Sequence, residues 1–198
     1  MNSTVLFAEE IDKMFLATIV NQVETEQPKY CNGGTMICLN GYYKIDFEIE
    51  VSFKGTLNSN ETFLDSDHYG YPFDIEVASK YLVIVGKSYG TEMVLKDIPV
   101  FETLESKHAI TGMSAINKLD ISTCHKLLLP MFFKGMGVEN SYAVSEWEAE
   151  ELKRYSSVIK VVDDHVLVSK GILVSELGKN IDYNKSFNED GLLRCSTR

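Results

Sequence analysis

The segment TMICLNGYYKIDFEIEVSF (residues 35–53) decides the predicted fold. Its Asn40-Gly41 pair is typical of a two-residue β-hairpin turn and separates Thr35–Leu39 from Tyr42–Phe53. In the second arm apolar and polar side chains alternate without a break, the apolar ones being Ile45, Phe47, Ile49, Val51 and Phe53 and the polar ones Lys44, Asp46, Glu48, Glu50 and Ser52. This period of two predicts a long strand with one face in the core and the other in water.

The segments on both sides of this hairpin carry other patterns. Apolar residues three and four positions apart predict an N-terminal helix over Thr4–Val23. Residues 55–73 are rich in Asn, Ser, Asp and Gly, which predicts a polar loop. Tyr81–Val85 and Thr91–Leu95 are predicted as strands joined by a turn at Lys87–Gly90.

The second half of the chain mixes helix and strand signals. Ser122–Leu129 is predicted as a helix that ends at Pro130, and Ser145 with Glu148 fits a capping box that opens a helix to about Tyr155. The remaining predicted elements are a hairpin of Val158–Val162 and His165–Val168 around Asp163-Asp164, and a third strand at Gly171–Leu177.

These elements do not alternate as βαβ units, and this order predicts the α+β class. We expect a mainly antiparallel sheet of hairpins, with the N-terminal helix and two or three further helices packed on it. The predicted domain covers residues 1–178, and residues 179–198 are expected to form a loosely held polar tail.

Composition limits the function. The chain has 198 residues, 44% of them hydrophobic, and a formal net charge of −10. Residues 1–110 hold 8 Lys and Arg against 17 Asp and Glu, so most of the acid excess lies in the first half. Nucleic-acid binding is therefore not expected, because neutralising phosphates requires clustered Lys and Arg.

We expect a cytoplasmic location, because no export or membrane signal is recognised in the sequence. Its longest apolar run, residues 127–133, is far shorter than the roughly 20 residues of a membrane span. None of the four cysteines forms a C-x-x-C pair, and reduced thiols are expected in an intracellular, soluble protein.

No catalytic or cofactor motif is complete, so no cofactor is expected and no catalytic residue is assigned. The nearest match is a calcium loop in which Asp65, Asp67, Gly70 and Glu76 take the first, third, sixth and twelfth positions. Tyr69 stands at the fifth position, where the loop needs an oxygen ligand. An acidic surface loop is the simpler interpretation.

The same loop is the predicted binding site, because tyrosines on a polar loop offer large contact area with a hydrogen-bonding tip. The predicted contact residues are Asp65, Asp67, His68, Tyr69, Tyr71 and Asp74 of the loop, together with Asp46, Glu48 and Glu50 of the strand.

We therefore expect an interaction protein of the inhibitor, immunity or viral accessory type. It would bind a basic surface of a macromolecular partner. Two alternatives remain: a small hydrolase or nucleotide-processing enzyme with a site assembled from dispersed His, Asp, Lys and Tyr residues, and a structural subunit of an assembly.

Overall fold

The computed structural model describes residues 10–27, 41–67, 80–88, 90–136, 142–184 and 186–196. The contacts of the chain group it into two compact units. We call residues 9–99 the barrel unit and residues 100–198 the C-terminal unit. Strands dominate the described residues and pair mostly antiparallel, as the predicted α+β class requires.

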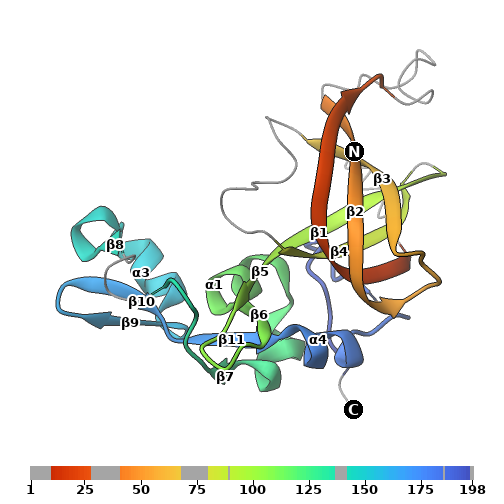
Figure 1. Cartoon of the computed structure of the whole chain (residues 1–198). Helices are drawn as coiled ribbons and strands as arrows, with labels where there is room; N and C mark the ends of the chain where they lie inside the picture. Colours follow the sequence, from red (N-terminus) through yellow and green to blue (C-terminus); the bar gives the residue numbers. More distant parts are fainter. Residues whose placement is uncertain are drawn as a thin grey trace, which may run out of the picture. The chain divides into compact units, whose positions relative to one another are not determined.

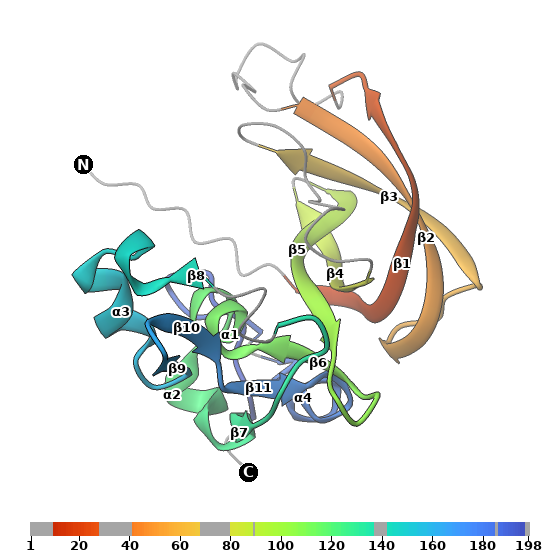
Figure 2. The same cartoon turned by 60° about the vertical axis from the view of Figure 1, so that its left-hand side comes forward.

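The barrel unit is built from strands that curl around a common core (Figures 1 and 2). They are β1 (Ile11–Thr25), β2 (Gly41–Lys54), β3 (Asn60–Asp67), β4 (Lys80–Ser88) and β5 (Thr91–Glu102), whose last residues belong to the C-terminal unit. Their hydrogen-bonded order is β3-β2-β1-β4-β5, and a parallel bridge between Leu64 and Met93 joins β3 to β5. The row of strands therefore closes on itself.

The predicted N-terminal helix is wrong, because Ile11–Thr25 is strand β1. Two features of this strand imitate a helical pattern. Met14–Ala17 are all buried, so apolar side chains stand at adjacent positions rather than at alternate ones. The pairing with β2 also shifts register beside Phe15 and around Val20, which breaks the period of two.

Strand β2 confirms the predicted alternation only over Ile45–Glu48, because Val51, predicted on the core face, is 44% exposed, and the surroundings of the strand also differ from the prediction. Over residues 42–48 both edges of β2 are occupied, one by β1 and the other by β3. The predicted first arm of the hairpin, Thr35–Leu39, lies outside the described residues. Part of the predicted polar loop is strand β3, whose apolar Phe63 faces the core.

Three phenylalanines from neighbouring strands form the centre of the barrel unit. The ring of Phe15 on β1 lies 5.6 Å from the ring of Phe47 on β2 and 5.6 Å from the ring of Phe63 on β3, centroid to centroid. All three side chains are buried. Apolar burial of aromatic side chains is a main source of stability, so this cluster fixes the inward face of β2 and with it the outward face.

The C-terminal unit continues the sheet from the end of β5. Its sheet strands are β6 (His108–Thr111), β11 (Lys170–Leu173) and β7 (Leu129–Pro130), paired in that order. A second sheet contains β8 (Tyr142–Ala143), β10 (His165–Val168) and β9 (Ile159–Val162). The helices among the described residues are all short: α1 (Gly112–Lys118), α2 (Ile121–Cys124), α3 (Ala149–Tyr155) and α4 (Val174–Asn180), with 3-10 turns η2 (His125–Leu127) and η4 (Val144–Glu146).

One prediction for this unit is confirmed and two differ from the structure. The β9–β10 hairpin turns at Asp163 and Asp164, both with positive φ, as a tight two-residue turn requires. The predicted capping box is displaced by one turn, because the Glu148 backbone N–H donates to Glu151 Oε2 at 3.2 Å. The predicted strand at Gly171–Leu177 is divided between β11 and α4.

A disulfide fastens the C-terminal segment to this unit. Cys124, at the end of α2, is bonded to Cys195, and both side chains are buried. The expectation of reduced thiols is therefore wrong for this pair, and their separation of 71 residues gives no local sequence signal.

Residues 179–198, predicted as a loosely held tail, make further contacts with the rest of the unit. Leu193 is buried and bridges to Leu119, while Ile181 bridges to Cys195.

Among the residues that the structure describes, no helix is long and apolar enough to cross a membrane.

Candidate functional site

The predicted contact residues fall into three groups in the structure. His68, Tyr69, Tyr71 and Asp74 lie outside the described residues, as does Glu76 of the calcium-like pattern. Asp65 and Asp67 are at the end of β3, where they pair with Tyr43 and Gly41 of β2. Asp46, Glu48 and Glu50 lie further along β2.

The described members of the predicted site are spread along β2 and the end of β3. Asp67 pairs with Gly41, which is seven residues from Glu48 on the same strand. At 3.3 Å per residue that separation is roughly 23 Å. Asp65 is 7% exposed and is therefore part of the buried interior rather than of an open acidic face.

Asp46 is engaged by both neighbouring strands. Thr62 Oγ1 of β3 donates to Asp46 Oδ1 at 2.5 Å, and Asn21 Nδ2 of β1 donates to Asp46 Oδ2 at 3.1 Å. Thr62 and Asn21 are also its register partners, so the three side chains point to the same side of the sheet. The hydrogen bonds from Thr62 and then Asn21 lower the pKa of the Asp46 carboxyl below its ordinary value of 3.8.

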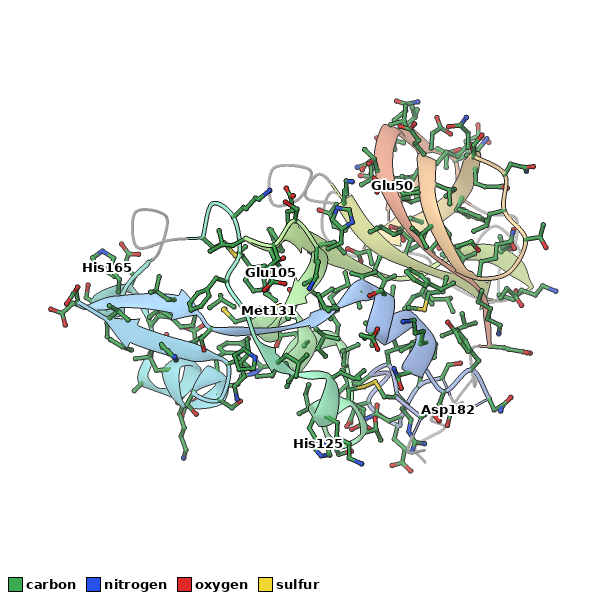
Figure 3. The ribbon with its side chains drawn as sticks, turned by 60° about the horizontal axis from the view of Figure 1, so that its bottom comes forward. Glu50, Glu105, His125, Met131, His165 and Asp182 are labelled. Carbon is green, nitrogen blue, oxygen red and sulfur yellow. A yellow bond between two sulfur atoms is a disulfide. The ribbon has the colours of Figure 1, made fainter. Side chains whose placement is uncertain are left out.

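The Glu50 carboxylate contacts side chains of β1 and β4. Lys80 Nζ lies 2.7 Å from Glu50 Oε1, and Thr18 Oγ1 of β1 donates to the same carboxylate at 3.2 Å. The β1–β2 pairing skips Glu50 between Ile49 and Val51, and this bulge places the carboxylate within reach of Lys80. Figure 3 labels Glu50 on the outside of the barrel unit.

Glu48 stands between these two carboxylates and differs from both. Its side chain is exposed, and it makes no hydrogen bond or ion pair with any residue that the structure describes. Its neighbours across the strands are Thr18 and Asn60. We call Asp46, Glu48 and Glu50 with these flanking polar residues the acidic face; of its three carboxylates, only that of Glu48 makes no bond to a described residue.

A second candidate site is a pocket of about 330 Å³ within the C-terminal unit. One wall is the turn Thr103–Lys107 between β5 and β6, the opposite wall is the segment Leu129–Phe132, and Leu173 of β11 completes the lining. Figure 3 shows Glu105 and Met131 from these two walls close to one another. We call the two walls the turn and the strap.

Large apolar side chains surround the opening of this pocket. Leu104 of the turn and Phe132 of the strap are each 65% exposed, and Leu129 is 47% exposed. The strap lies within residues 127–133, the longest apolar run of the sequence, and such a run by itself predicts no binding site. This run lacks the alternation of apolar and polar residues that is typical of a half-buried strand. That lack is the sequence signal that could have indicated the pocket.

The His, Cys, Asp and Glu side chains of the described residues are the possible metal ligands. No three His, Cys, Asp or Glu side chains within the described ranges are placed to hold a metal ion. His125 and His165 lie in different parts of the C-terminal unit (Figure 3), and the ring of each is hydrogen-bonded to a nearby backbone carbonyl. His108 lies on β6, opposite Glu102.

The chain matches no family model, no curated protein sequence and no solved structure.

Proposed function

We propose that this chain is a protein-binding module that engages a basic surface of a macromolecular partner through the acidic face of its barrel unit. The observation that carries the proposal is the exposed Glu48 carboxylate between Asp46 and Glu50, on a strand whose inward face is fixed by the core. A strand in a closed barrel holds the backbone of these residues in a fixed place, which favours recognition.

The charge of the barrel unit supports a basic partner. Residues 9–99 contain 15 Asp and Glu but only 7 Lys, whereas the rest of the chain is close to neutral. An acid excess of this kind produces a negative potential that attracts a basic surface and speeds its encounter. Contacts between exposed charges are screened by salt, so the association is expected to weaken as ionic strength rises.

Nucleic acid is the ligand that a small barrel would otherwise suggest. Five-stranded barrels include the OB-folds, which bind oligonucleotides on their second and third strands. In this chain β2 directs Asp46 and Glu48 outward on that face against a single exposed lysine, Lys44, and Asn60 and Thr62 of β3 add no positive charge. Phosphates would be repelled there, so a basic protein surface is the better ligand.

The test begins with a partner isolated from the native host by affinity capture and identified by mass spectrometry. Its association rate with the wild-type chain is then compared with that of Glu48→Lys over a range of salt concentrations. We expect Glu48→Lys to lower the rate about threefold or more at low salt and to reduce its dependence on salt.

Glu176→Lys is the matched control, because it changes the net charge by the same amount but lies on α4 of the C-terminal unit. If both variants slow association equally, only total charge matters and the acidic face has no special role. If neither variant changes the rate, the proposed mechanism is wrong.

A further inference from the structure

We propose that the pocket between the turn and the strap binds a bulky apolar side chain presented by an extended segment of a protein partner. This inference goes beyond the acidic face, since it concerns a different surface with different chemistry. It depends on three observations: the walls are fixed, the opening is apolar and exposed, and its charges are paired.

Hydrogen bonds fix both walls of the pocket. In the turn, the Thr103 N–H donates to the Lys107 carbonyl at 2.8 Å, and Thr103 Oγ1 accepts from the Lys107 N–H at 3.1 Å. The strap is bonded on both sides, because the Met131 N–H donates to the Ser169 carbonyl at 3.2 Å and the Phe132 carbonyl accepts from the Leu104 N–H at 3.0 Å. A preformed pocket loses little entropy when it is filled, which favours binding.

The exposed side chains at the opening indicate a protein rather than a small molecule. Leu104 and Phe132 line the pocket and are each 65% exposed, so a ligand confined to the 330 Å³ would cover only the parts of these side chains that face it. A polypeptide that inserts one side chain and crosses the opening can cover both, and an anchor of this kind is a common centre of protein interfaces. The volume, at the small end of the range for ligand pockets, suits a single large side chain.

The charges beside the pocket indicate a neutral anchor. Glu105 is paired with Lys107 at 2.6 Å, and Glu102 is paired with Lys134 at 2.6 Å. Each carboxylate is therefore balanced by a lysine, in a chain with a net charge of −10. Neither a phosphate nor a guanidinium is favoured at the opening, whereas an aliphatic or aromatic side chain meets no electrostatic penalty.

The experiment is selection of a random peptide library displayed on phage against the full-length chain. The affinities of the enriched peptides are then measured for wild type and for Phe132→Ser and Leu104→Ser. We expect the enriched peptides to share a bulky apolar residue, and each variant to weaken their binding at least about tenfold.

The matched control is Val161→Ser, which removes an exposed apolar side chain of the same unit outside the pocket and should leave the affinities unchanged. Thermal unfolding of all three variants verifies that they are folded. Glu48→Lys separates this proposal from the proposed function, because it should not affect peptides held in the pocket.

The proposal is overturned if no peptide is enriched, or if the enriched peptides bind Phe132→Ser and Leu104→Ser as tightly as wild type. Basic peptides that respond only to Glu48→Lys would support the acidic face and contradict the pocket. Loss of binding with Val161→Ser as well would also count against the pocket, because it would indicate general adhesion to exposed apolar groups.

Discussion

At the scale of single residues, carboxylates on the same strand have different roles. Asp46 and Glu50 accept hydrogen bonds from side chains of the adjacent strands, so their charges help to connect β3, β2, β1 and β4. Glu48, which lies between them, has no such bonds with described residues and is available to a partner. The acidic face therefore combines structural carboxylates with one that makes no bond to a described residue.

The hydrogen bonds to Asp46 predict an acid-dependent loss of stability. Its pKa is lower in the folded chain than the ordinary 3.8, so its stabilising effect is complete above pH 3.8 and disappears as pH falls through the folded value. Asp46→Asn should therefore unfold at lower urea concentration than wild type at pH 7, and the difference should narrow at pH values below 3.8. Glu48→Gln is the control, and an equal effect of that variant would contradict the assignment.

At the scale of secondary-structure elements, the sequence was informative where one physical pattern acted alone. Strand β2 has a buried and an exposed face at its Ile45–Glu48 centre, so its alternation was readable. Strand β1 is buried on both sides at Met14–Ala17 and contains bulges, and these features produced helix-like spacing. Long-range pairing, rather than local preference, determines such a strand.

Strand β11 supplies a prediction at this scale, because Gly171 packs tightly against its neighbours. A Cβ at Gly171 would lie 2.5 Å from the Ile110 carbonyl oxygen and 2.6 Å from Met131 Sδ of the strap. Gly171→Ala should therefore destabilise the chain by about 1–3 kcal/mol, since backbone and strap must move apart.

Urea unfolding followed by circular dichroism measures this change. Lys170→Ala, at the preceding position of the same strand, is the control and should be within about 0.5 kcal/mol of wild type. A Gly171→Ala variant as stable as the control would mean that the strap can move away from the added methyl group at little cost in free energy. The walls of the pocket would then be less fixed than the hydrogen bonds indicate.

At the scale of the whole molecule, the disulfide predicts a redox-dependent stability. Cross-linking Cys124 to Cys195 restricts an unfolded chain over 71 residues, which corresponds to about 4 kcal/mol in the chain-entropy treatment. Reduction with a thiol should thus lower the unfolding midpoint. A Cys124→Ala/Cys195→Ala variant should resemble the reduced protein and show no response to the thiol, and a response of that variant would exclude this disulfide as the cause.

The acidic face could be predicted from the sequence in part, whereas the pocket could not. The acidic residues of β2 were identified because they belong to one strand with one period. The pocket combines Leu104, Phe132 and Leu173, which are separated along the chain and meet only through the pairing of β5, β6 and β11. The disulfide has the same origin. No local sequence pattern predicts contacts of this kind, because residues that are distant along the chain are brought together only by the tertiary fold.

The disulfide also has a mechanical consequence. Tension applied between the two chain ends passes directly from Cys124 to Cys195 through the sulfur atoms, so the residues between them bear no load. At about 3.4 Å per extended residue, the 71-residue separation hides roughly 240 Å of chain from a stretching force. This interval contains α3, β9, β10, β11 and α4. A stretching force can therefore not extend these elements until the disulfide is broken.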